Sequence, residues 1–356
     1  MAPEQYSDDL PPYEARAWED LQGWKQRHFA QGEREGGTWR QRLGRAGDVA
    51  RRRLEALPGV EAFHGLFGEA LRGLTDLGSR AATASVRRQS VLRAYRKRGH
   101  PVSSLEDIRR LDLRHIDDTK PRLDLGYIAA SAVGGAGTGL AVSGGQLVAA
   151  GGTVATAGAG VAPGAATIVG AMAVDAAAVL FASHRVVAHI AAYYGYDAEA
   201  PAERLIALGV LGVGTANQRA KAAAYLELNR VVQGLARREA WQELSTSVLT
   251  AVVNQVYQVL GIRLTKRKLA QAIPVAGILI GAGLNARTLA QIADEADHLY
   301  RERFLRERYG LAPGGFAPGG FAPDTRPSPA DEDTLRITDI IDAEIVEDEI
   351  VEDDGQ

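Results

Sequence analysis

Apolar side chains recur at helical spacing along most of the chain. The spacing is clearest at Trp18, Leu21 and Trp24, at Phe63, Leu66, Phe67, Leu71 and Leu74, and at Leu228, Val232 and Leu235. Apolar residues three or four positions apart lie on one face of a helix, whereas a half-buried strand alternates apolar and polar residues. The pattern therefore predicts an all-α protein, a multi-helix bundle with little sign of strands.

Prolines mark two of the predicted helix starts. Pro201, with Glu203 in the first turn, begins one helix, and Pro274 begins a longer one that runs to about Tyr309. Proline suits the first turn of a helix because its missing N–H would have no partner there.

Two further signals predict a helix start and a helix end. Ser103 and Glu106 have the spacing of a capping box, so a short helix is expected over Leu105 to Arg114. A helix over Ala165 to Tyr194 is expected to end at Gly195, because glycine readily takes the left-handed conformation that closes many helices.

The stretch from Leu125 to Ser183 holds 59 residues and a single charged side chain, Asp175. Tyr127 to Gly151 and Ala165 to Ser183 are long enough to cross a bilayer, which needs about 20 residues. Alanine and glycine gain little from lipid, however, and a central Asp costs about 2.5–3.5 kcal/mol. The composition therefore favours a soluble or peripheral bundle over an integral membrane protein.

Small residues four positions apart predict closely packed, Gly/Ala-rich central helices. The pairs are Gly135 with Gly139, Gly160 with Gly164, and Gly277 with Gly281. A residue without a side chain lets two helix backbones approach closely, a device that is favoured in lipid and also found in tight soluble cores.

The absence of cysteine from all 356 residues excludes disulfides, thiolate metal sites and cysteine nucleophiles. The first residues lack the basic and apolar regions of a signal peptide, so a cytoplasmic start is expected. Residues 324–356 carry 13 acidic side chains and two arginines, a net charge of −11, which leaves +8 for the rest of the chain.

These shifts in composition divide the chain into four predicted parts. We expect a disordered N-terminus over residues 1–12 and a helical domain over 13–310. A Gly/Pro linker follows over 311–323, where Gly-Gly-Phe-Ala-Pro occurs twice, and an acidic disordered tail over 324–356, where Glu-Ile-Val-Glu-Asp occurs twice.

Asp175 is the strongest candidate for a functional residue, because a carboxylate among small apolar residues must be solvated, paired or protonated. On a helical wheel, Arg185 and His189 lie within about 80° of Asp175. Arg185 is about 15 Å further along the axis, so a partner from another helix is expected instead. A structural ion pair is favoured, and a ligand or proton site is the alternative.

Other sites are not supported by the sequence. Gly135 to Gly139 lacks the spacing of a nucleotide loop, and His184 and His189 point about 140° apart, too far to share a metal. No catalytic set, metal site or cofactor is therefore predicted.

Basic residues are clustered at two places, Arg51, Arg52 and Arg53 and again Arg96, Lys97 and Arg98. These side chains are expected to contact anionic lipid, the acidic tail or solvent. Nucleic acid is an unlikely partner, since no nucleic-acid fold motif accompanies them.

Several elements in this order resemble the EcsC family of bacterial proteins. Tyr194-Gly195-Tyr196-Asp197 follows Asp175, and Ile273-Pro274-Val275-Ala276-Gly277 leads into Gly281-Ala282-Gly283 and Asn285. The resemblance covers about residues 13–310 and includes a first helix with tryptophan and the Gly/Ala-rich middle.

The resemblance implies a helical protein without an assigned reaction. The founding member of the family is encoded beside an ABC transporter, and the family has no established catalytic residues to carry over. The positions that match the family pattern are Asp175, Tyr194, Gly195, Asp197, Pro274, Gly277 and Asn285. Of these, Asp175, Tyr194, Asp197 and Asn285, with Arg185 and His189, are our candidate binding residues.

Together the patterns favour a non-enzymatic, membrane-associated helical accessory protein, cytoplasmic and peripheral at the inner face of the cell membrane, linked to transport or envelope function. Its expected partners are the membrane surface or a membrane protein complex, and a protein bound by the acidic tail. Two other classes stay open: a hydrolase-like enzyme that uses Asp175 in a polar pocket, and a soluble scaffold that docks partners through its tail.

Overall fold

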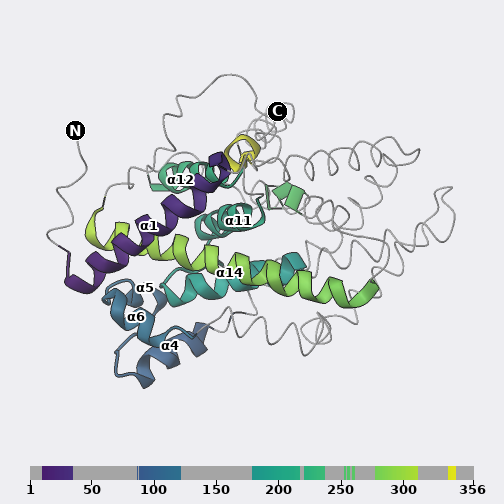
Figure 1. The fold of residues 1–356 in the computed structure, drawn as a ribbon. Coiled ribbons are helices and arrows are strands. Elements are labelled where there is room, and N and C mark those ends of the chain that lie inside the picture. Colours follow the sequence, from purple (N-terminus) through teal and green to yellow (C-terminus); the bar gives the residue numbers. More distant parts are fainter. Residues whose placement is uncertain are drawn as a thin grey trace, which may run out of the picture.

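The structure, a computed structural model, describes residues 10–34, 86, 88–121, 179–216, 220–236, 252–253, 255–256, 259–260, 277–311 and 336–341. Every regular element in these ranges is a helix, which confirms the predicted all-α fold (Figure 1). The helices with defined bounds are α1 (Pro12–Arg34), α4 (Arg88–Lys97), α5 (Leu105–Ile108), α6 (Leu113–Thr119), α11 (Pro201–Thr215), α12 (Lys221–Ala236) and α14 (Gly277–Tyr309). Residues 179–193 and 337–341 are also helical.

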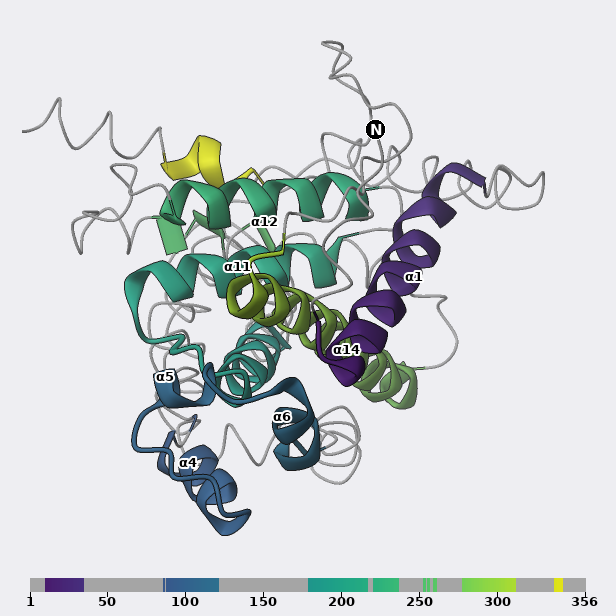
Figure 2. The ribbon, with the colours of Figure 1, turned by 90° about the vertical axis from the view of Figure 1, so that its left-hand side faces the viewer.

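Helix α14 is the central element of the bundle. Figures 1 and 2 show it passing between α1, α11 and α12 on one side and the smaller helices α4, α5 and α6 on the other. Helix α11 packs on both α12 and α14, and α1 packs on α14 and α6. The helix ends at Tyr309, as its pattern predicts.

Helix α11 forms the middle of the core. It begins at Pro201, as predicted, and every residue from Leu205 to Thr215 is buried. A helix that is apolar all round belongs in a protein interior. Two glycines allow its neighbours to come close: a Cβ added at Gly209 would lie 2.7 Å from a methyl of Leu228 in α12, and one at Gly214 would lie 3.0 Å from Ile292 in α14.

Gly195 closes the helix of residues 179–193 with a φ of +85°, the left-handed conformation that the sequence predicts. The position is also crowded, because an added Cβ would lie 2.6 Å from the carbonyl oxygen of Leu105. The turn therefore brings the chain directly against α5, and no larger residue fits there.

The predicted short helix over Leu105 to Arg114 is instead two helices, α5 and α6. The cap also differs by one position: Ser104 is the N-cap, and Asp107 accepts hydrogen bonds from the backbone N–H groups of Ser103 and Ser104 at 2.8 and 2.9 Å. At the start of α6, directly after the N-cap residue Asp112, the buried carboxylate of Glu14, on α1, accepts the N–H of Leu113 at 3.0 Å. Such a cap from a distant helix leaves no local sequence signal.

The acidic tail contains one short segment that differs from its expected disorder. Residues 337–341 are helical, and the side chains of Ile337 and Ile341 are buried. The backbone N–H and the hydroxyl of Thr338 both donate to one carboxylate oxygen of Glu227 on α12, at 2.8 and 2.6 Å. The charge of Glu227 stabilises the N-terminus of this short helix.

Several predictions fall outside the described residues. They concern residues 35–85, the linker after Leu311, the glycine pairs near 135 and 160, and the Gly/Ala-rich stretch up to residue 178. Among the helices that the structure does describe, none combines the length and apolar character needed to cross a membrane. The division into four parts stays a prediction.

Candidate functional site

Tyr194 is fully buried and belongs to a polar cluster between α6 and α14. Its hydroxyl donates to Asp297 at 3.0 Å and accepts from Lys120 at 2.9 Å, and Lys120 forms an ion pair with Asp297. Burial, followed by the charge of Asp297, raises the pKa of Tyr194 well above its usual value. Tyr194 is therefore a neutral hydrogen-bonding group that fixes the end of its helix to α14.

Asp197 lies three residues further along and faces a different element. Its carboxylate pairs with Arg88 of α4 at 3.0 Å and accepts the backbone N–H of Glu199 at 3.1 Å. The local bond closes the turn that precedes α11. Asp197 thus fixes the turn before α11 to α4.

Arg185 and His189 occupy the helix of residues 179–193 and are half-buried. The ring of His189 contacts that of Tyr193, with the centroids 5.4 Å apart. Burial, followed by the charge of Arg185, lowers the pKa of His189 to about 4, so the imidazole is neutral. Asp175 and the side chain of Asn285 lie outside the described residues, so a site at Asp175 stays a prediction.

The candidate binding residues that the structure describes therefore do not lie around one shared site. Tyr194 faces α6 and α14, whereas Asp197 faces α4. Most of the buried polar contacts lie along the second half of α14, which also carries Asp297.

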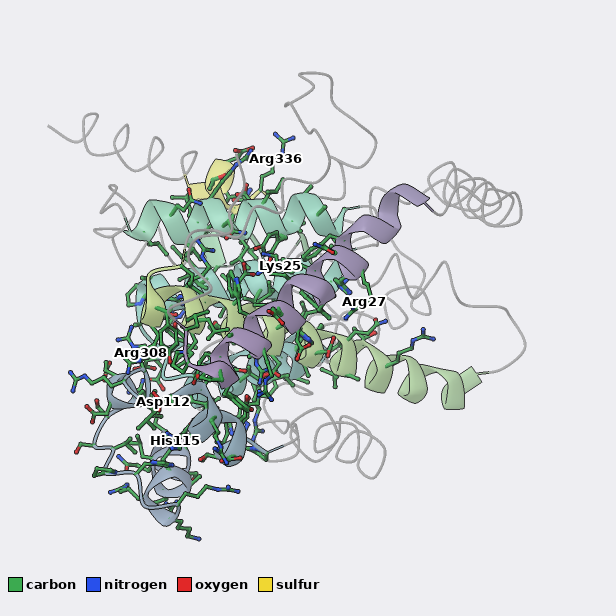
Figure 3. All side chains as sticks on the ribbon, turned by 60° about the vertical axis from the view of Figure 1, so that its left-hand side comes forward. Lys25, Arg27, Asp112, His115, Arg308 and Arg336 are labelled. Carbon is green, nitrogen blue, oxygen red and sulfur yellow. The ribbon has the colours of Figure 1, made fainter. Side chains whose placement is uncertain are left out.

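Lys25 of α1, which is labelled in Figure 3, forms a buried ion pair with Glu302 of α14 at 2.7 Å, and the lysine side chain is 0% exposed. Tyr225 of α12 donates its hydroxyl to the same carboxylate oxygen at 2.7 Å. Burial lowers the pKa of Lys25, and Glu302 opposes that effect. One carboxylate thereby joins three helices.

A second shared carboxylate, Glu295, lies about two turns earlier on α14. It is paired with Lys221 of α12, and His28 of α1 donates to it at 2.7 Å. Burial, followed by the charge of Lys221, lowers the pKa of His28 to about 4, so this imidazole is neutral. Trp24 lies parallel to the rings of both His28 and His298, at centroid distances of 4.5 and 4.1 Å.

Arg303 provides the contact between α14 and the start of α11. Its guanidinium binds both oxygens of Glu203 at 2.6 and 2.7 Å and also donates to Glu307 at 2.6 Å. The guanidinium lies 4.0 Å from the ring centroid of Tyr196, whose hydroxyl donates to Glu307 at 3.0 Å. Planar two-point pairing of this kind fixes geometry as well as charge.

Between these contacts, α11, α12 and α14 line a partly open cavity of about 230 Å³. Its apolar wall is formed by Ile206, Val210, Leu228, Val232, Leu299 and Leu311. Its polar side is formed by Asn229 and Gln233 of α12 and by Glu302, Arg303, Arg306 and Glu307 of α14. Mixed linings of this type suit small ligands that have an apolar body and a polar end.

These cavity and ion-pair residues were not identified from the sequence. One signal was present: Glu295, Leu299, Glu302 and Arg306 share a helix face because they are spaced four, three and four residues apart. Charges on the same face as a core leucine must find partners inside the protein. The sequence could not name those partners, since Lys25 and Glu302 are 277 positions apart.

The comparisons with known proteins agree with the resemblance seen in the sequence. Residues 146–305 match the EcsC protein family. Over an alignment of 225 residues, the chain is 28% identical to the uncharacterized protein YdbA of Bacillus subtilis (strain 168). The alignment covers 60% of this chain and 68% of YdbA. No solved structure matches the chain. The resemblance to the EcsC family is thus confirmed, and residues 146–305, which include all of α11 and α12, are an EcsC family region.

Proposed function

We propose that this chain is a non-enzymatic helical accessory protein that binds the anionic inner surface of a membrane through the basic face of α4. The observation that carries the proposal is the two-sided character of this helix. Val91, Leu92 and Tyr95 are buried, and the hydroxyl of Tyr95 donates to the carbonyl oxygen of Tyr193 at 2.6 Å. The apolar side therefore fixes α4 to the helix of residues 179–193.

The opposite side of α4 is basic. Arg93, Arg96 and Lys97 of α4 are exposed, as is Arg98 in the turn directly after it, and within the described part of the chain none of them has an acidic partner. Helix α4 lies at one end of the molecule, where its side chains extend away from the bundle (Figure 3). Such a surface is accessible to a flat, negatively charged partner.

The size of the expected effect follows from membrane electrostatics. Each basic residue near an anionic leaflet contributes about 1 kcal/mol, so four give reversible binding that falls with salt. The low-charge stretch from Leu125 to Ser183 would add apolar contact with lipid or with a membrane protein complex. A link to transport or envelope function is part of this proposal and is supported by the family resemblance.

Co-sedimentation with vesicles tests this proposal. The variant Arg93→Gln/Arg96→Gln/Lys97→Gln/Arg98→Gln should lose at least about tenfold in affinity for phosphatidylglycerol vesicles. A matched control removes four exposed charges elsewhere, in Arg16→Gln/Arg27→Gln/Arg230→Gln/Arg308→Gln, and should keep most of the binding. Equal losses in both variants, or no binding by the unaltered protein, would refute α4 as the contact.

The acidic tail fits a role as a self-masking arm in the same proposal. Its net charge of −11 matches the sign of an anionic lipid surface, so the tail would compete for the basic face. Deleting residues 324–356 should therefore strengthen vesicle binding at low salt. Weaker binding after the deletion would contradict masking and would make the tail a tether.

A soluble scaffold is the second candidate, favoured by the docked segment of residues 336–341. The short tail helix is bonded to Glu227 of α12, and its two isoleucines are buried. A helix that binds through its apolar side chains is a common mode of peptide recognition. A pull-down that keeps all partners after deletion of the tail would count against this candidate. The hydrolase alternative depends on Asp175 and stays a sequence prediction.

A further inference from the structure

We propose that the cavity between α11, α12 and α14 binds a small single-chain carboxylate that carries a second polar group, such as a hydroxyl, near its far end. The inference is independent of membrane binding through α4, because the two features use different helices. Three observations support it: the apolar wall and, within the part of the chain that the structure describes, a guanidinium without a carboxylate partner and a buried hydroxyl without a hydrogen-bond partner.

The volume and the wall define the body of the ligand. The cavity measures about 230 Å³, somewhat below the roughly 300–1,000 Å³ of pockets for drug-sized molecules. At about 30 Å³ for each water-sized group, it holds a chain of about eight such groups. Leucine, valine and isoleucine side chains from three helices line it, so a flexible aliphatic chain fits best.

Arg306 defines the anionic end. Its guanidinium is half-buried and donates one hydrogen bond, to the side-chain oxygen of Asn229 at 3.0 Å. No ion pair between Arg306 and a carboxylate occurs within the described residues: one oxygen of Glu302 accepts from Lys25 and Tyr225, and Glu307 accepts from Arg303 and Tyr196. The remaining N–H donors suit a carboxylate, which a guanidinium binds in a planar, two-point arrangement.

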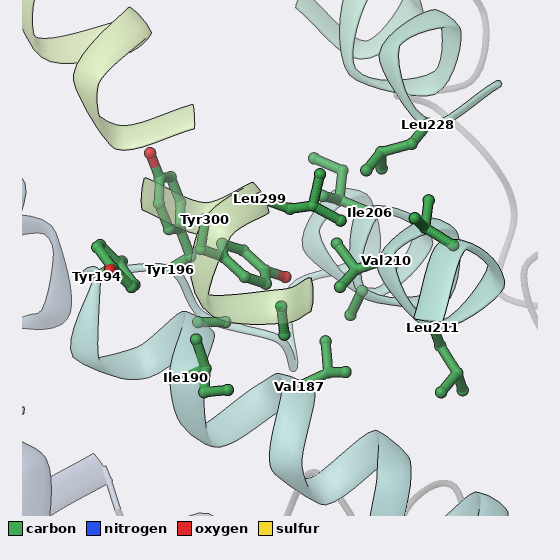
Figure 4. Packing of buried hydrophobic residues seen from close by; sticks show 14 of the residues in the cluster. Val187, Ile190, Tyr194, Tyr196, Ile206, Val210, Leu211, Leu228, Leu299 and Tyr300 are labelled. Atoms are coloured by element: carbon green, nitrogen blue, oxygen red, sulfur yellow. The ribbon is translucent and has the colours of Figure 1, made fainter. Parts of the chain in front are cut away.

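Tyr300 defines the far end. Tyr300 is 1% exposed, and among the described residues its hydroxyl has no hydrogen-bond partner. Figure 4 shows the ring extending from α14 toward Val210 of α11, and both residues line the cavity. A buried hydroxyl without a partner is unfavourable, so a ligand oxygen at this point would satisfy it.

The test measures binding of octanoate, octanol and 8-hydroxyoctanoate to the full chain by isothermal titration calorimetry. Octanoate should bind more tightly than octanol by about tenfold, because only the acid has a charge for Arg306. The hydroxy acid should bind more tightly than octanoate by about fivefold through Tyr300. Hydroxy acids one or two carbons shorter or longer serve as a length series.

Two variants assign these effects to their residues. Arg306→Gln should reduce the affinity for octanoate about tenfold or more and leave octanol binding unchanged. Tyr300→Phe should abolish the advantage of the hydroxy acids over the plain acids. The same variant should raise the thermal midpoint of the ligand-free protein, since it removes an unsatisfied polar group. Arg308→Gln, on the same helix and outside the cavity lining, is the matched control.

Three outcomes would overturn the inference. Octanoate that fails to bind would exclude the site, and equal binding of octanoate and octanol would exclude an anionic end at Arg306. A lower thermal midpoint in Tyr300→Phe, or a preference for hydroxy acids that survives this substitution, would exclude Tyr300 as the second contact. Vesicle binding through α4 would be unaffected by any of these results.

Discussion

At the residue scale, the charge of Lys25 lies in the protein interior, so its contribution to stability depends on its partner. The ammonium is 0% exposed and balances Glu302, which also accepts from Tyr225. Taking two ions out of water is costly, and their attraction compensates for that cost only while both are present. The ion pair therefore determines how α1 packs on α14, and it adds little to the free energy of unfolding.

Lys25→Met should lower the free energy of unfolding by about 3–5 kcal/mol, because it leaves Glu302 buried without its cation. The double variant Lys25→Met/Glu302→Gln should recover most of that loss, since the amide oxygen still accepts the hydroxyl of Tyr225. Denaturant unfolding monitored by circular dichroism measures both changes. A single variant as stable as the unaltered protein would contradict the buried pair.

Gly195→Ala should destabilise the protein more than Gly99→Ala, although both glycines have φ near +85°. The left-handed backbone alone costs about 1–2 kcal/mol for a residue with a side chain. An added Cβ at Gly99 meets nothing within 4 Å, whereas at Gly195 it would lie 2.6 Å from a carbonyl oxygen of α5. Thermal unfolding of the two variants separates strain from crowding, and equal losses would contradict the tight turn.

At the scale of the helices, local patterns predicted some boundaries and missed others. Proline at residue 201 and glycine at residue 195 act on their own turns, so the start of α11 and the preceding helix end could be read directly. At the break between α5 and α6, Glu14 from another helix accepts the N–H of Leu113, and no spacing within residues 105–114 reveals it. Sequence spacing predicts which residues are neighbours on one helix, but it does not predict their partners on another helix.

Packing of α11 gives a second example of this difference. We expected close helix approach at glycines four residues apart, and the described close approaches are at Gly209 and Gly214. Their importance comes from Leu228 and Ile292, which pack against them from α12 and α14. Only the assembled bundle identifies which glycines need to lack a side chain.

Glu227→Ala should release the short tail helix of residues 337–341 from α12. The substitution removes the acceptor of two hydrogen bonds from Thr338, so amide protection over residues 336–341 should fall about tenfold or more. Hydrogen exchange measured by mass spectrometry checks this. Thr338→Val, which keeps the backbone bond, should have an intermediate effect, and unchanged protection in Glu227→Ala would contradict the docking.

At the scale of the whole molecule, three neutral histidines link stability to pH, of which His184 is buried and His28 and His189 are half-buried. Burial lowers the pKa of His28, His184 and His189 to about 4, below their usual value of 6.5. Between pH 6.5 and 4 the unfolded chain binds protons that the folded chain does not, so stability is lost as the pH falls. Each histidine contributes up to about 1.4 kcal/mol per pH unit across that window.

His184→Asn should therefore reduce the slope of unfolding free energy against pH between 6.5 and 4. Denaturant unfolding at several pH values measures the slope in both proteins. Carboxylates elsewhere titrate in both proteins alike, so the difference between the two slopes isolates His184. Identical slopes would contradict a buried, neutral His184.

Membrane binding through the basic face of α4 is the central claim about the whole molecule, and cell fractionation tests it most directly. The full-length protein should be recovered with the membranes and should be released by a high-salt wash, because charge dominates the contact. Recovery in the cytosol alone would contradict membrane association. Resistance to both high salt and carbonate would contradict a peripheral contact and indicate that the Gly/Ala-rich stretch inserts.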